Sequence, residues 1–296
     1  MGRMHYSSVS YKIFTISNYL FLSLLALVCL VPLIHILAVS LSSKAAADAN
    51  MVSFWPVKPT FMAYTETAMN NAFFRAFGIG LLRTIIGPAV SLVVCVMAAY
   101  SLEKESREFK SRSIYVWFFV FTMIFNGGLV PTYMVISYLQ LRNSFLVLIL
   151  PAVVGVYNII LLINFFRTSV PSALKDAAYV DGASHFRTMF SIYLPLSVPA
   201  IVTISLFNIV YHWNSYFDGL IYMTNIKNYP LATFLQTFIV AENFTAAGVD
   251  KSMIKLFSNR TVRAAEIFLA ITPVLAVYPF LQRYFIKGIV LGSIKE

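Results

Sequence analysis

Six long apolar stretches separated by polar segments dominate the pattern of this sequence. They lie at about 18–41, 78–102, 113–136, 145–166, 198–222 and 265–285. Each is long enough to cross about 30 Å of hydrocarbon as an α-helix, because a helix rises about 1.5 Å per residue. The runs are continuously apolar rather than alternating, which favours helices over membrane β-strands. The pattern therefore predicts an all-α membrane protein with six transmembrane helices.

The segments outside these runs divide the chain into three parts. They are an N-terminal segment 1–17, a six-helix permease-like domain 18–285 and a C-terminal tail 286–296. The first apolar run is about twice as long as the apolar part of a secretory signal, so we expect a retained helix. With the N-terminus inside, the inner segments carry slightly more Lys and Arg than the outer ones. This bias predicts cytoplasmic termini, although it is weak.

Composition excludes several classes of protein. The chain is 59% hydrophobic and only 11% charged, a balance that would make a soluble enzyme aggregate. Its net charge of +10 comes without a basic cluster interleaved with aromatic residues, so nucleic-acid binding is not expected. Cys29 and Cys95 both lie in apolar runs and lack metal-ligand spacing, which predicts buried free thiols.

The segment 171–197 combines charge, turn residues and amphipathic periodicity before the fifth apolar run. We expect a short helix over about 172–180, a break at Asp181-Gly182, and a second amphipathic helix over about 183–193. Such a segment would lie along the membrane face as a cytoplasmic loop rather than cross the membrane.

This loop contains two acids, small residues, a glycine and a Leu-Pro pair at fixed offsets, namely Asp176, Ala177, Ala178, Asp181, Gly182, Ala183, Leu194 and Pro195. The pattern resembles the EAA coupling loop of ABC importer permeases. Asp176 stands where that family usually has Glu, so a salt bridge to a partner would be made with a shorter side chain. The stretch 213–216 resembles carbohydrate permeases of the maltose type, and 125–133 resembles their polysaccharide and oligosaccharide branch. Within that branch, the smaller permease of an alginate importer is one candidate match.

The resemblance implies a bacterial cytoplasmic-membrane import complex that works by alternating access. Its other parts would be a second homologous permease, an ATPase dimer, an extracytoplasmic solute-binding protein and a saccharide substrate. The coupling loop would meet the ATPase, and a tail containing Gly288 and Gly292 would reach toward it. No cofactor is implied for this chain, because its partners would bind ATP and Mg²⁺. Consistently, the sequence contains no G-x-x-x-x-G-K-[ST] phosphate loop and no catalytic constellation.

Polar residues inside the apolar runs are candidates for the substrate pathway, because lipid-facing polar groups are unfavourable. Amides and aromatic rings suit sugars, and the candidates are Gly155, Asn158, Asn208, Tyr211, His212 and Ser215. Packing between helices is an equally good interpretation of each. We expect Arg83 to extend toward the outer interface, and His35 to satisfy the backbone near Pro32 or a neighbouring group.

Basic residues assigned to the outer mouth would favour an acidic saccharide, such as an alginate or pectin fragment; they are Arg75, Arg83, Lys251, Lys255, Arg260 and Arg263. Solvated loop charges are the alternative interpretation. Three other functions stay open from the sequence alone: an ion-coupled secondary transporter, an importer permease for a non-sugar solute, and a non-transporting anchor subunit. The lack of acidic residues near the middle of the spans counts against the ion-coupled carrier.

Overall fold

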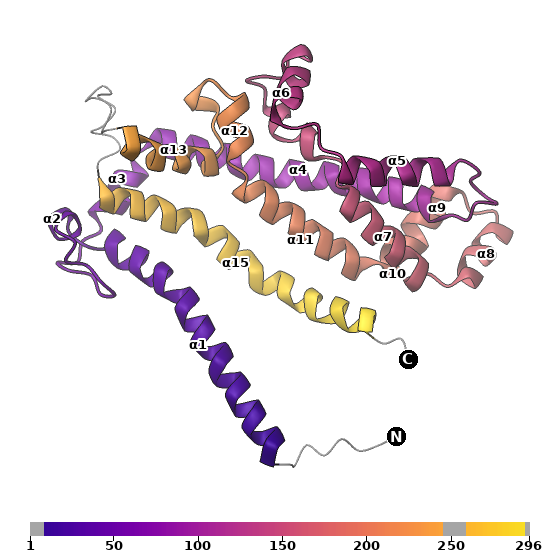
Figure 1. Cartoon of the computed structure of the whole chain (residues 1–296), viewed down its shortest axis with the longest axis horizontal. Coiled ribbons are helices and arrows are strands. Elements are labelled where there is room, and N and C mark those ends of the chain that lie inside the picture. The colour runs from indigo at the N-terminus through magenta and orange to yellow at the C-terminus, as the bar shows by residue number, and fades with distance from the viewer. Residues whose placement is uncertain (1–8, 245–258, 294–296) are drawn as a thin grey trace. The chain divides into compact units, whose positions relative to one another are not determined.

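The computed structural model describes residues 9–244 and 259–293, and every regular element in these ranges is helical (Figure 1). The α-helices are α1 (Val9–Ser40), α2 (Lys44–Asp48), α3 (Met62–Ala68), α4 (Asn71–Glu103), α5 (Arg112–Ile124), α6 (Leu129–Tyr138), α7 (Val156–Ser169), α8 (Ser172–Val180), α9 (His185–Thr188), α10 (Leu194–Leu196), α11 (Val198–Asn214), α12 (Phe217–Tyr222), α13 (Leu231–Phe244) and α15 (Arg260–Ser293). Three short 3-10 helices are η1 (Phe145–Leu148), η2 (Leu150–Ala152) and η4 (Ile226–Asn228), and η3 (Met189–Tyr193) is a π-helix. The predicted all-helical class is therefore confirmed.

The chain divides into two compact units. The first contains residues 1–71 and 238–272. Its small core joins the end of α1 to α2 and the start of α15, through Ala38, Val39, Ala46, Ala47, Val52 and Ala264. Polar contacts reinforce this junction, because Arg260 donates to the Ala47 carbonyl at 3.0 Å and Asn70 donates to Glu266 at 2.9 Å. His35 meets a neighbouring group, since its Nδ1 lies 2.8 Å from the Ser53 carbonyl.

The second unit contains residues 72–237 and 273–296 and holds the larger core. Here α7 contacts both α5 and α11. The core gathers apolar side chains from α4, α7, η3 and α11, namely Cys95, Val96, Ala99, Tyr100, Leu102, Ile159, Leu162, Ile163, Phe166, Val170, Met189, Tyr193, Ala200 and Ile204. Cys95 is buried as expected, whereas Cys29 on α1 is exposed. The sequence-based expectation of a buried thiol is therefore wrong for Cys29.

Among the described residues, α1 and α4 are each long and apolar enough to cross a membrane as single helices. Three further helix pairs meet the same test only when each bent pair counts as one span, which raises the number to as many as five. The structure thus shows a helical membrane protein with several candidate spans.

The third expected span, 113–136, is not one helix. α5 ends at Ile124, and α6 starts at Leu129 at an angle of 116° to it. Gly128 between them has φ of +87°, a left-handed conformation that glycine adopts without strain, and its N–H donates to the Asn126 side chain at 2.9 Å. A single continuous helix over this run was therefore a wrong prediction, and the glycine pair explains the break.

The other differences concern where helices bend or end. The fourth run begins as 3-10 turns and bends by 49° before α7, next to Pro151. The fifth run ends its main helix at Asn214 and resumes as α12 after Ser215 and Tyr216, rather than continuing to 222. α15 continues without a helix end at 285, so its backbone includes most of the segment expected to form a separate tail.

Candidate functional site

The loop before α11 folds as the sequence predicts. α8 spans Ser172–Val180, and its end forms a Schellman motif in which Ala183 N–H donates to the Ala178 carbonyl and Gly182 N–H to the Tyr179 carbonyl. Gly182 has φ of +72°, and no atom lies within 4 Å of the position that a Cβ would take. The glycine is therefore needed for its backbone conformation and not for space.

One face of α8 is exposed along its whole length. Ala173, Asp176, Ala177 and Val180 follow the i, i+3, i+4, i+7 spacing of one helix face, and all four are exposed. We call these four residues the outer face of α8. Val180 is 88% exposed, and the only ion pairs in the described part of the chain, Arg83–Asp218 and Lys175–Glu108, leave Asp176 out. The outer face thus presents one carboxylate between small and apolar side chains.

The opposite face of α8 is held against the charged loop between α4 and α5. Ala178 is buried there, and Lys175 Nζ pairs with Glu108 Oε1 at 2.5 Å. Burial acts to lower the pKa of Lys175, but its hydrogen bond to Glu108 and the negative charges of Glu103 and Glu108 outweigh burial and raise the net pKa. Lys175 therefore stays protonated, and its ion pair with Glu108 holds α8 to the loop between α4 and α5. We call this contact the first anchor of the loop.

A second anchor follows the turn. Ser184 caps α9 by accepting from Arg187 N–H at 3.3 Å, and the chain then winds into the π-helix η3 ahead of Pro195. Tyr193 at the end of η3 donates to Glu103 Oε2 at 3.1 Å. Burial raises the pKa of Tyr193 and the Glu103 charge raises it further, so the hydroxyl stays protonated as a donor.

Aromatic packing strengthens this second anchor. The Tyr193 ring lies edge-on to Tyr100 of α4 at 4.9 Å and to Phe166 of α7 at 5.3 Å. Leu194 packs against the same core, while Pro195 is exposed. The loop is therefore attached to the α4–α5 loop before its turn and to α4 and α7 after it.

These anchors were not found by sequence analysis. Lys175, Glu108, Glu103 and Tyr193 are brought together by the fold from segments far apart in the chain. The signal in the sequence is the dense run of both charge signs at 103–112.

The structure brings together two of the predicted pathway positions. Asn158 of α7 donates from Nδ2 to Asn208 Oδ1 of α11 at 3.4 Å. Asn208 is buried, and its own Nδ2 has no hydrogen-bond partner in the described structure. Gly155 lies one turn before Asn158, and a Cβ there would come within 2.8 Å of the Asn158 amide. The two amides therefore form one polar pair between neighbouring helices.

The remaining predicted positions on α11 fall on two different faces. Tyr211 and Ser215 line a cavity of about 380 Å³ near the break before α12, together with Val210, Asn214, Tyr216 and Phe217. His212, by contrast, is buried at 2% exposure against Gly87, where a Cβ would lie 2.6 Å from the ring. His212 therefore belongs to the packing between α4 and α11.

Arg83 does not extend to the interface, so that expectation is wrong. Its side chain is fully buried and forms an ion pair with Asp218 in the first turn of α12. Its Nη1 also donates to the Ser215 carbonyl at 2.9 Å, and its Nε lies 3.4 Å from His212 Nδ1. The guanidinium thereby donates to a carbonyl at the C-terminal end of α11, which has no partner within the helix, and its ion pair with Asp218 holds α12 next to that end.

The other basic residues assigned to the outer mouth differ among themselves. Arg75 is exposed, whereas Arg260 contacts Asn50 and the Ala47 carbonyl. Lys251 and Lys255 lie outside the described residues. Gly288 and Gly292 lie in the backbone of α15, and contact with an ATPase stays a prediction. Within 9–244 and 259–293, no group of three or more His, Cys, Asp or Glu side chains could hold a metal ion.

Comparison with known proteins identifies the family. The chain is 34% identical over 289 residues to the polygalacturonan/rhamnogalacturonan transport system permease protein YtcP of Bacillus subtilis, covering 96% of this chain and 99% of that one. It is 27% identical over 240 residues to the arabinooligosaccharides transport system permease protein AraQ of Halalkalibacterium halodurans, covering 78% and 77%. No family model matches the chain.

A solved structure supports the same assignment. The fold matches a chain from a bacterial ABC transporter involved in the import of the acidic polysaccharide alginate, with a TM-score of 0.84 and 31% sequence identity. The match covers 94% of this chain and 98% of that one. This chain is therefore a multi-pass bacterial membrane protein that belongs to the carbohydrate ABC importer family, as a permease subunit and not a catalytic one.

Proposed function

We propose that this permease carries an acidic oligosaccharide, and that the outer face of α8 docks onto an ATPase subunit to drive it. The full importer would contain this chain, a second homologous permease, an ATPase dimer and an extracytoplasmic binding protein. Six spans would complete the membrane domain, with α15 as the sixth and α8 on the cytoplasmic side. Family membership sets aside the ion-coupled carrier and the anchor subunit as alternatives.

The exposed outer face of α8 is the observation that carries the coupling proposal. A short helix with small side chains lets a partner surface approach closely, and Asp176 offers a carboxylate for a cation in that surface. Val180 and Leu174 are 88% and 46% exposed, so apolar area is available for burial by a partner. Asp176, Ala177 and Asp181 are all exposed, as docking requires.

The anchors on the inner side of α8 supply a route for the motion. A displacement of α8 would be transmitted to the α4–α5 loop through Lys175 and Glu108, and to the end of α4 through Tyr193 and Glu103. Because the loop is also continuous with α7 and α11, movement of the ATPase would reach three packed helices at once. Two discrete positions of this assembly would correspond to inward and outward access.

The cavity on α11 supports a saccharide pathway. Its lining offers the phenol ring of Tyr211, the amide of Asn214 and the hydroxyl of Ser215. The ring can stack on the apolar face of a sugar, and the amide and hydroxyl can form hydrogen bonds with sugar hydroxyls. We propose that the Asn158–Asn208 pair extends this lining, because the unpartnered Nδ2 of Asn208 can still donate a hydrogen bond. His212 would act indirectly, by supporting the helix that carries Tyr211.

Two lines of support favour an acidic saccharide. The cavity lining contains no carboxylate, and the next acid along the chain, Asp218, is neutralised by Arg83. A uronate would therefore meet no uncompensated negative charge there. In addition, the B. subtilis relative and the solved alginate transporter are both described with acidic polysaccharides. Arg83 itself is not available to attract the substrate, because its charge is already paired.

The test is substrate-stimulated ATP hydrolysis by the reconstituted importer. Uronic oligosaccharides and neutral oligosaccharides of matched length would be compared in the presence of the binding protein. We expect the uronic series to stimulate hydrolysis more strongly. Equal or stronger stimulation by the neutral series would refute the acidic preference, and stimulation by a peptide or amino acid alone would favour a non-sugar solute.

A further inference from the structure

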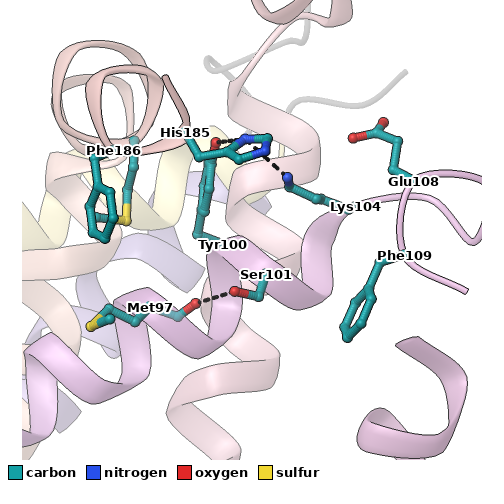
Figure 2. Close-up of a pocket in the computed structure, with 9 residues that line it drawn as sticks. Met97, Tyr100, Ser101, Lys104, Glu108, Phe109, His185 and Phe186 are labelled. Carbon is teal, nitrogen blue, oxygen red and sulfur yellow. Dashed lines mark hydrogen bonds between the residues drawn. The ribbon is translucent and has the colours of Figure 1, made fainter. Parts of the chain in front are cut away.

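A groove of about 340 Å³ opens at the end of α4, beside the segment that follows α8 (Figure 2). One wall is formed by Met97, Tyr100 and Ser101, which share one face of α4, and by Lys104, the residue that follows the end of α4. The other wall comes from α9 and η3, and the α4–α5 loop closes the end, through His185, Phe186, Met189, Glu108 and Phe109. None of the residues of the outer face of α8 lines this groove.

Lys104 is a half-buried cation in the groove that forms no ion pair among the described residues, although the nearby charges of Glu108 and Glu103 attract it. Its Nζ lies 3.2 Å from His185 Nδ1 and 5.4 Å from the centre of the Tyr100 ring, and neither ion pair in the described part of the chain includes it. Burial lowers the pKa of this ammonium. Nδ1 of His185 can accept from the Lys104 ammonium, which leaves Nε2 as the ring nitrogen that can donate to a ligand.

The two ends of the groove differ in polarity, although apolar Phe109 also lies at the charged end. Met97 and Phe186 are exposed apolar residues at one end, Ser101 supplies a hydroxyl in the middle, and Lys104 with Glu108 lies at the other end. From Met97 to Glu103, the last residue of α4, the helix rises about 9 Å. Figure 2 shows Phe186 and Phe109 on either side of the group formed by Tyr100, His185 and Lys104. A phospholipid presents acyl chain, ester and headgroup in the same order.

We propose that this groove binds one phospholipid with an amine-bearing headgroup, with its phosphate at Lys104 and His185 and its amine at Oε2 of Glu108, whose Oε1 pairs with Lys175. The proposal rests on the proposed topology, which places the end of α4 at the cytoplasmic surface of the membrane. A headgroup without an amine would fit less well, because it would offer no donor to Oε2 of Glu108, the carboxylate oxygen that Lys175 leaves open. A bound lipid would connect α4 to the chain segment that leads from α8 into α11.

The experiment uses the intact importer, purified, delipidated and titrated with defined lipids under native mass spectrometry. We expect phosphatidylethanolamine to bind in preference to phosphatidylglycerol, and Lys104→Gln to weaken this binding on the order of tenfold by removing one charge-assisted contact. Lys110→Gln is the matched control, because Lys110 is an exposed cation of the same loop that does not line the groove. Ser101→Trp, which fills the groove from an exposed position, should also remove the lipid.

Equal phosphatidylethanolamine binding by Lys104→Gln and Lys110→Gln would overturn the proposal. Preferential binding of phosphatidylglycerol by the unmodified importer would overturn it as well. Failure of the proposed function would be seen separately, as loss of ATPase co-purification in the unmodified complex. Lipid binding is measured only on complexes that retain the ATPase, so the two outcomes are distinguishable.

Discussion

Replacing Asp218 by Asn should destabilise the protein by about 3–5 kcal/mol, because it leaves the buried Arg83 guanidinium without a counter-charge. The Arg83 side chain has no exposed surface, and its remaining acceptors, the Ser215 carbonyl and His212 Nδ1, are neutral. Asn keeps the shape of Asp, removes its charge and replaces one accepting oxygen by an NH2 donor, whereas both Asp218 oxygens accept from Arg83. The substitution therefore removes the counter-charge and one acceptor of the guanidinium together.

Replacing Arg83 should destabilise the protein less than replacing Asp218. Arg83→Met removes the cation and keeps much of the apolar stem, while Asp218 retains hydrogen bonds from Ser215 Oγ at 3.1 Å and Gly219 N–H at 2.9 Å. The Asp218 side chain is also 19% exposed, so part of its charge stays solvated. We expect a loss of about 2–3 kcal/mol from Arg83→Met.

The double variant measures the coupling between the two groups. Because Arg83→Met with Asp218→Asn leaves no unpaired charge, its cost should be at least about 2 kcal/mol smaller than the sum of the single costs. Unfolding by sodium dodecyl sulfate in mixed micelles gives these values, with tryptophan fluorescence as the signal. Trp213 reports locally, since its ring lies edge-on to Phe77 at 5.9 Å.

Arg75→Met is the control for this cycle, because Arg75 is an exposed arginine on the same helix and its loss should change stability by less than about 0.5 kcal/mol. Additive single costs, within about 0.5 kcal/mol, would refute the assignment of a coupled buried pair. So would an Asp218→Asn variant as stable as the unmodified protein.

Two further predictions concern the coupling loop. Gly182→Val should lower substrate-stimulated ATP hydrolysis and Gly182→Asn should largely preserve it, because Asn tolerates positive φ whereas a β-branched residue is strained there by more than about 1–2 kcal/mol; equal activity of the two variants would contradict the backbone explanation. A cysteine introduced by Ser184→Cys should react with an impermeant thiol reagent only after the cells are opened, and labelling from outside intact cells would reverse the proposed topology.

The sequence predicted α8 well because its signals are local. Ser172–Val180 is a stretch of good helix formers, and the Asp181-Gly182 break that follows is encoded by glycine's access to positive φ. The same reasoning failed at 113–136, because Gly127 and Gly128 are compatible with a membrane helix as well as with a turn. Only tertiary structure decides between these two conformations.

The buried contacts were beyond sequence reasoning for a different reason. Arg83 and Asp218 are 135 positions apart, and Lys175 and Glu108 are 67 apart. An arginine near the end of an apolar run is equally consistent with extension to the interface, which is what we expected. The candidate pathway residues on α11 are likewise separated by packing, since Asn208 and His212 are buried and Tyr211 is exposed. Contacts between distant helices decide whether such a side chain is buried or exposed, and the local sequence pattern does not contain this information.

Contact between α8 and the ATPase is the most direct test of the central claim. A chain with Cys29 and Cys95 replaced by Ala would carry Ala177→Cys on the outer face of α8, labelled with a short photoactivatable maleimide in the assembled importer. We predict a crosslink to the ATPase subunit at this position, and none from the control Met69→Cys, which is 81% exposed and lies outside the coupling loop. A crosslink from Met69→Cys but not from Ala177→Cys, or from neither, would contradict the assignment of α8 as the coupling element.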